Sequence, residues 1–151
     1  MARAGKEDAQ LTAARASAYR ILADCFYSPL GLKAEEVRLL VKAAQVTCPA
    51  AASSASAMAE ALEAMEPERM SLRIDYARLF VGPAELLAPP YGSVYLDGEY
   101  RINGRSTSDA ERHYTAAGLH VESTGGEPAD FIATELEFLY YLAFQSLDNE
   151  E

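Results

Sequence analysis

Apolar side chains recur at steps of three and four along the first fifty residues. This is the period of an amphipathic helix, and it predicts a helix from about Asp8 to Tyr27, ended by Pro29 and Gly31. A second helix is expected from Ala34 to Val46, before Pro49. The positions expected to face the core are Leu11, Ala14, Ala18, Leu22 and Cys25 in the first helix and Val37, Leu40, Val41 and Ala44 in the second.

Two further helices are expected before residue 84. Ser53 and Ser54 are typical of a helix N-terminus, and a third helix follows them. Pro67 separates it from a fourth helix, which Gly82-Pro83 ends. The apolar positions are Met58, Leu62 and Met65 in the third helix and Ile74, Tyr76, Leu79 and Phe80 in the fourth.

Residues 81–105 differ from the segments before them, because prolines, glycines and aromatic residues replace the helical pattern. Asp97-Gly98 and Asn103-Gly104 are turn dipeptides, and weak alternation over residues 93–104 would suit a short hairpin. The favoured interpretation is an ordered, aromatic-rich loop that lies over the helices. A loop of this length is typical of a segment with a function.

Helical patterning returns for two more helices. Ser108 and Glu111 have the spacing of a capping box at the start of the fifth helix, and Gly118 is placed to end it. The sixth helix is expected to begin at Glu127-Pro128-Ala129-Asp130, with Pro128 as its first residue and Asp130 in its first turn, where the helix dipole favours an anion. Apolar residues on more than one face predict a central helix that is buried on several sides. One polar stripe crosses it: Asp130, Thr134, Glu137 and Tyr141.

The fold class expected from these elements is all-α, with about six helices and a long aromatic and proline-rich loop. The chain has 151 residues, half of them hydrophobic. This length suits one domain with a real core, and neither a repeat nor an interdomain linker is visible. We therefore expect residues 1–151 to form a single helical domain.

Charge narrows the choice of partners. The formal net charge is −10, and almost all of it lies in residues 76–151, which carry four basic and thirteen acidic side chains. Nucleic acids and anionic membrane surfaces are unsuitable partners for such a chain. The acidity serves either solubility or the binding of something cationic. The first residues show no basic segment followed by an apolar one, and no apolar segment is long enough to span a membrane. A cytoplasmic protein is therefore expected.

Motifs for catalysis are missing from the sequence. There is no dinucleotide or P-loop glycine pattern and no nucleophile elbow. His113 and His120 are separated by the helix-ending Gly118, and Cys25 and Cys48 form neither a CxxC pair nor a disulfide framework. We expect no catalytic residue, no metal site, no cofactor and no stable membrane insertion.

An aromatic and proline-rich corner joins the fourth helix to the loop. Tyr76, Phe80, Tyr91 and Tyr95 offer stiff contact surfaces with polar tips, and the prolines among them restrict the backbone. From the residues alone, these rings either pin the loop to the core or receive a ligand.

Two blocks of residues resemble a known family. The first comprises Tyr76–Pro83 and Pro89–Asp97, and the second is Glu127-Pro128-Ala129-Asp130 with the apolar helix after it. In order and separation they resemble the TorD/DmsD/NarJ-like cytoplasmic chaperones, the redox enzyme maturation proteins of molybdenum-containing oxidoreductases. The resemblance implies an all-α fold, no catalysis, and binding of the twin-arginine signal peptide of a molybdoenzyme catalytic subunit, whose maturation before export the chaperone assists.

The resemblance also implies a binding site for that peptide, which carries paired arginines followed by an apolar stretch. Acidic groups would attract the arginines, and the corner would receive the apolar stretch. Asp130 has two compatible roles, as the stabiliser of a helix terminus and as the partner of an arginine. The expected contacts are Tyr76, Phe80, Pro90, Tyr91, Ser93, Tyr95, Pro128, Asp130 and Phe131, with Phe26, Tyr27, Glu127 and Glu137 as further candidates.

The chain departs from the family pattern in several respects, of which two concern the site and the fold most directly. Phe131 stands where many relatives have a histidine, and relatives continue with further C-terminal helices. The last helix would then lack part of its cover. Either the chain is shortened, or a partner chain supplies the cover, as in a domain-swapped homodimer. The alternative function is a helical cofactor-binding or oligomerisation module that binds no signal peptide.

Overall fold

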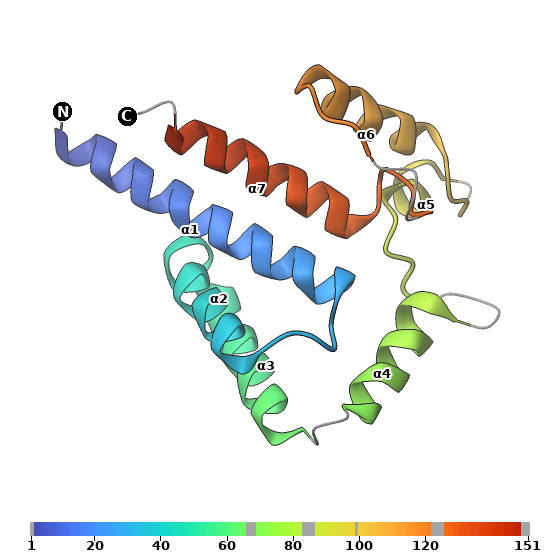
Figure 1. Ribbon diagram of the computed structural model, residues 1–151, viewed down its shortest axis with the longest axis horizontal. Coiled ribbons are helices and arrows are strands. Elements are labelled where there is room, and N and C mark those ends of the chain that lie inside the picture. The colour runs from blue at the N-terminus through green and yellow to red at the C-terminus, as the bar shows by residue number, and fades with distance from the viewer. Residues whose placement is uncertain (1, 66–68, 83–86, 99, 122–125, 149–151) are drawn as a thin grey trace.

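The computed structural model describes residues 2–65, 69–82, 87–98, 100–121 and 126–148. These residues form helices and connections without a strand, which confirms the all-α prediction. None of the described helices is both long and apolar enough to cross a bilayer. The elements in chain order are α1 (Ala2–Tyr27), α2 (Ala34–Thr47), η1 (Pro49–Ala51), α3 (Ala52–Ala64), α4 (Met70–Tyr76), η2 (Ala77–Val81), α5 (Gly92–Leu96), α6 (Arg105–Ala116) and α7 (Ile132–Asp148) (Figure 1).

The first core cluster lies where α1, α2 and α3 meet. Val37 of α2 is completely buried at its centre, and Cys25 of α1 packs at its edge. The predicted apolar stripes of these helices therefore face one another. The buried members are Ile21, Leu32, Val37, Leu40, Ala55, Ala59 and Leu62, with Met58 and Met65 packed against them.

Helix starts are where the local pattern was least informative. α1 begins at Ala2, ahead of the predicted Asp8, and it continues through Gly5 although glycine is a poor helix former. α3 follows directly on the turn η1, so Ser53 and Ser54 lie inside its first turn and do not cap it. The predicted capping box at Ser108 is also wrong, because α6 begins at Arg105.

Asp97 replaces Ser108 as the residue that caps α6. Its carboxylate accepts the Ser106 backbone N–H at 3.0 Å and the Ser106 hydroxyl at 2.5 Å. These bonds lower the pKa of Asp97, the hydroxyl bond most. A Cβ added to Gly104 would collide with the Asp97 carboxylate, so the absence of a side chain at Gly104 permits this close approach.

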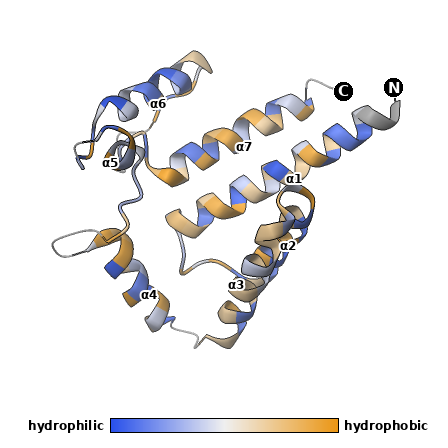
Figure 2. Ribbon diagram, turned by 180° about the vertical axis from the view of Figure 1, so that it is seen from behind, coloured by the Kyte–Doolittle hydropathy of each residue, from blue (hydrophilic) through white to orange (hydrophobic). Residues whose placement is uncertain are grey.

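α7 runs antiparallel to α1, and the two helices lie side by side along most of their length (Figure 1). A second core cluster joins them through Ala23 of α1 and Phe131 and Ala133 at the start of α7. The predicted burial of α7 on several sides is wrong, since Leu142 is 43 % and Phe144 52 % exposed. The hydropathy colouring shows apolar residues along this helix, whose outer face is not covered by the described residues (Figure 2).

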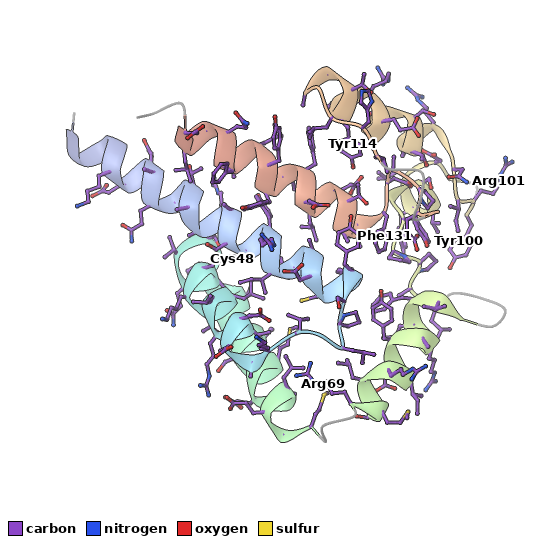
Figure 3. All side chains as sticks on the ribbon, viewed as in Figure 1. Cys48, Arg69, Tyr100, Arg101, Tyr114 and Phe131 are labelled. Atoms are coloured by element: carbon purple, nitrogen blue, oxygen red, sulfur yellow. The ribbon has the colours of Figure 1, made fainter. Side chains whose placement is uncertain are left out.

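α4 and the π-helical turn η2 carry the predicted fourth helix, but with little burial. Ile74 is 58 % exposed, while Leu72 packs against the first core cluster. Arg69 precedes α4 and donates hydrogen bonds to the carbonyls of Leu30 and Leu32, which ties this helix to the connection between α1 and α2 (Figure 3).

The segment after η2 contains the short helix α5, and the hairpin considered for residues 93–104 does not form in its described part. The turns were located correctly, since Gly98 has φ 77° and Asn103 φ 64°. The hairpin pattern fails because Tyr91 pairs with Phe131 of a distant segment, and the chain turns into α5 immediately after it.

The two cysteines are expected to differ in reactivity. Burial, and then the charge of Asp24, raises the pKa of Cys25 to about 11, whereas Cys48 is exposed. At pH 8 iodoacetamide should therefore label Cys48 within minutes and leave Cys25 unmodified in the folded protein. Mass spectrometry of tryptic peptides measures both sites, and labelling in urea provides the control. Equal labelling of the two cysteines without urea would contradict the burial of Cys25.

Candidate functional site

The predicted aromatic corner assembles where the C-terminal end of α1 meets η2. The Phe80 ring packs edge-on against Phe26, with centroids 5.4 Å apart, and lies 5.0 Å from Tyr76. The Tyr76 hydroxyl donates to the backbone carbonyl of Phe26 at 2.6 Å. Part of this corner is therefore structural, because it fastens η2 to α1.

The same corner borders a small pocket of about 270 Å³. Phe26 and Phe80 form one side, Pro90 and Tyr91 another, and Tyr95 of α5 stands at the edge with 61 % of its surface exposed. The rings therefore pin the segment, and they also leave a hollow beside it. That this hollow receives a ligand stays a prediction.

Asp130 joins three segments beneath this pocket and is completely buried. Its carboxylate accepts the Ser93 backbone N–H at 2.6 Å and the Thr107 hydroxyl at 2.8 Å. Its backbone carbonyl accepts the N–H of Gly92 at 3.0 Å. The expected helix-terminus role is thus exerted on α5, whose first turn contains Ser93, and not on the helix that follows Asp130 in sequence.

The start of the last helix is corrected accordingly. α7 begins at Ile132, so Pro128 is not its first residue and Asp130 is not in its first turn. The Phe131 N–H donates to the Pro128 carbonyl in a turn, and the Ile132 N–H donates to the Pro90 carbonyl. The backbone before α7 is therefore used to hold the segment of Pro90, which prevents an earlier helix start.

Phe131 lies between two tyrosine rings. Its centroid is 5.6 Å from that of Tyr27 and 5.8 Å from that of Tyr91, and only 5 % of Phe131 is exposed. In Figure 3 it sits at the start of α7, beside the connection to α5. A direct contact of Phe131 with a peptide stays a prediction, and so does that of the fully buried Ser93.

A larger pocket of about 600 Å³ lies on the Tyr27 side of Phe131, whereas the small pocket lies on its Tyr91 side. The last turn of α1, the connection between α6 and α7, and the polar stripe of α7 border it. Sequence analysis selected three of its residues as contacts, Tyr27, Glu127 and Glu137, and placed Thr134 and Tyr141 on the polar stripe of the last helix. It did not find the contributions of Tyr114, Leu119, His120, Val121, Phe138, Tyr140 and Phe144.

Tyrosine hydroxyls connect the acidic residues of the site. Tyr91 donates to the Glu127 carboxylate at 2.8 Å, and Tyr27 donates to that of Glu137 at 3.3 Å. Burial raises the pKa of Tyr91, with the Glu127 hydrogen bond as the next cause, and burial also raises the pKa of Tyr27. Both hydroxyls therefore remain protonated donors at neutral pH.

Glu135 is the acidic residue of the small pocket. Burial, and then the charge of Asp130, raises the pKa of Glu135 above its ordinary value of 4.5. The cost of ionising Glu135 in the folded protein is absent below pH 4.5, appears as the pH rises through the raised pKa, and is complete above it.

Glu135→Gln is therefore expected to stabilise the protein at pH 7, and the gain should disappear as the pH falls below 4.5. Urea unfolding of both proteins at several pH values measures the difference. Glu111→Gln, at an exposed position on α6, is the matched control and should show no such pH dependence. A destabilised Glu135→Gln protein at pH 7 would contradict the raised pKa.

Among the described residues, no group of three His, Cys, Asp or Glu side chains is placed to hold a metal ion. The chemistry that the site does offer is a pair of adjoining hollows. One is apolar and proline-lined, and the other is aromatic and acidic. Phe26 and Tyr27 are neighbours in α1, but Phe26 lines the small pocket and Tyr27 lines the larger one. The last turn of α1 therefore separates the two pockets.

Comparisons with known proteins agree with this architecture. A family model described as nitrate reductase delta subunit matches residues 46–151. The chain is 33 % identical over 94 residues to the chaperone protein TorD of Aliivibrio fischeri, covering 60 % of this chain and 44 % of the relative. It is 37 % identical over 73 residues to the Tat proofreading chaperone DmsD of Salmonella paratyphi A, covering 48 % and 36 %.

One solved structure has a similar fold. It is that of a protein assigned as a redox enzyme maturation protein from Archaeoglobus fulgidus, with a TM-score of 0.56 and 23 % identity over 83 % of this chain and 70 % of that one. At this identity the likeness concerns the fold alone. The chain spans less than half the length of the curated relatives that it matches.

Proposed function

The chain belongs to the nitrate reductase delta subunit family, and from this premise we propose that it is a chaperone for a molybdenum-dependent oxidoreductase. It binds the twin-arginine signal peptide of the catalytic subunit and assists maturation before export. Relatives named TorD and DmsD, both chaperones and not enzymes, support this function and a non-catalytic role. A cytoplasmic location and a single domain over residues 1–151 are parts of the same proposal.

One observation carries the proposal: the two sequence blocks meet at one site, where Ser93 and Asp130 are in contact although 37 residues separate them in the chain. Asp130 of the second block holds the N-terminus of α5 in the first, and the small pocket opens beside it. This pocket has the composition that suits an apolar peptide segment, with stiff rings and prolines that lose little entropy on binding. We place the apolar stretch of the signal peptide there, against Phe80, Pro90, Tyr91 and Tyr95.

Calorimetry with a synthetic twin-arginine signal peptide tests the proposal. Tyr95→Ala should weaken binding about tenfold, because an exposed ring at the pocket edge contributes contact area without supporting the core. Leu39→Ala, at an exposed position of α2 that lines neither pocket, should leave affinity unchanged. Absence of binding at low salt, where a relative binds its own peptide, would refute the proposed function.

The alternative, an oligomerisation module, is favoured by the exposed apolar residues of α7, which include Leu139, Leu142 and Phe144. A homodimer, domain-swapped or not, stays a prediction. Light scattering separates the alternatives, since a stable dimer that ignores the signal peptide would favour the oligomerisation module and a peptide-binding species would favour the chaperone.

A further inference from the structure

The larger pocket differs from the corner pocket in charge. Its volume of about 600 Å³ lies within the range of ligand sites, and its wall is largely aromatic. The residues that line it include the carboxylates of Glu127 and Glu137 and one histidine, His120, but neither a lysine nor an arginine. Since no described residue that lines the pocket is a lysine or an arginine, a cationic occupant would supply the charge that complements these carboxylates.

Each carboxylate is restrained by a hydrogen bond from a tyrosine hydroxyl. Tyr91 donates to Oε2 of Glu127, and Tyr27 donates to Oε2 of Glu137 while it shares a 3.0 Å hydrogen bond with Thr134. A carboxylate accepts about four hydrogen bonds, so each retains acceptor capacity for a ligand. Fixed acceptors lose little entropy when a donor binds.

The aromatic wall is suited to a flat cation. Guanidinium groups stack on tyrosine faces, and the chain itself shows this contact. The guanidinium carbon of Arg20 lies 5.7 Å from the ring centroid of Tyr140, which lines the pocket. Tyr27 and Tyr141 add further rings beside Glu137.

Asp130 is less suited to bind a cation directly. It is completely buried, and both carboxylate oxygens already accept hydrogen bonds, one from Ser93 and one from Thr107. Because Asp130 is completely buried, a ligand arginine could reach its carboxylate only if the junction of α5 and α6 opened. Glu127 and Glu137 are both exposed and require no such rearrangement.

We propose that the larger pocket binds the guanidinium groups of an arginine-containing peptide, with Glu127 and Glu137 as the anionic partners and Tyr27 and Tyr141 as stacking surfaces. The inference rests on the proposed function for the identity of the peptide. It gives each part of that peptide a place: arginines in the larger pocket, and the apolar stretch in the corner pocket across the last turn of α1. Asp130 then acts as a positioning residue for the corner.

The first test uses butylguanidinium as a small probe, observed by NMR at the tyrosine rings. Saturable shifts at Tyr27, Tyr140 and Tyr141 are expected, and Glu137→Gln should weaken binding about tenfold. Glu111→Gln on α6 is the matched control and should leave the affinity unchanged. Absence of saturable shifts, equal weakening by both substitutions, or equal affinity for butylammonium would overturn the guanidinium site.

The second test uses the signal peptide and a variant peptide with both arginines replaced by glutamine. Glu137→Gln should lower the affinity for the arginine peptide about tenfold and leave the affinity for the glutamine peptide unchanged. If the arginine peptide binds and Glu137→Gln changes nothing, the pocket assignment is wrong while the proposed function stands. If butylguanidinium binds at these tyrosines but the signal peptide does not bind, the proposed function is wrong and the guanidinium site stands.

Discussion

Asp130→Ala is expected to lower the free energy of unfolding by about 3 kcal/mol. The substitution leaves the Ser93 N–H and the Thr107 hydroxyl buried without the carboxylate that accepts from both. Each hydrogen bond to a charged acceptor contributes about 1.5–3 kcal/mol, and part of the sum is offset because the variant no longer buries a carboxylate. Urea unfolding followed by circular dichroism measures the loss.

Two further variants sharpen this test. Asp130→Asn can still accept from the Ser93 N–H and can donate to the Thr107 oxygen, so it should lose only about 1 kcal/mol. Ser93→Ala keeps the backbone donor and removes a buried hydroxyl that has no hydrogen-bond partner among the described residues, so its stability should be unchanged or slightly higher. If Asp130→Ala were no less stable than Ser93→Ala, Asp130 would not be the junction of α5, α6 and α7.

Phe131→Ala is expected to cost about 3–4 kcal/mol, because it removes a nearly fully buried ring and leaves a cavity in the cluster that joins α1 and α7. The rings of Tyr27 and Tyr91 would also lose the surface against which they pack. Thermal and urea unfolding measure the loss of stability.

Phe144→Ala is the matched control for this core substitution. It makes the same change at a position that is 52 % exposed, and it should cost less than about 1 kcal/mol. Similar losses for the two variants would show that the start of α7 does not carry the second core cluster. Because Tyr27 and Tyr91 border different pockets, Phe131→Ala should also weaken signal-peptide binding if the proposed function is correct.

Helix positions and inward faces were largely predictable. The stripes of residues 8–27 and 34–46 follow from a local period, and Val37, Leu40 and Leu62 are buried as expected. The ends at Tyr27 and at Gly118, which has φ 75°, follow from local residues as well. Starts were predicted less well, since α6 is capped by Asp97 from outside the helix.

The candidate site was predictable as a set of residues but not as an arrangement. The aromatic corner and the acidic stripe were both visible in the sequence, yet their division into two pockets was not. Tyr114 and Tyr140 escaped notice because a pocket wall is defined by which helices face one another, and α6 reaches α7 only through tertiary packing. The extent of burial of α7 was overestimated for the same reason.

Asp130 illustrates the difference between what a local pattern predicts and what tertiary contacts add. Local patterns were sufficient to predict an all-helical chain, its inward faces, and an anion close to a helix N-terminus, because periodicity and capping act over three or four residues. Long-range contacts assign this anion to α5 and α6, because its partners Ser93 and Thr107 lie 37 and 23 residues away in the chain. Such hydrogen bonds depend on which segments meet in space, and no local pattern specifies that. The same holds for Glu127 and Glu137, whose placement on the wall of an aromatic pocket follows from the packing of α7 against α1 and α6.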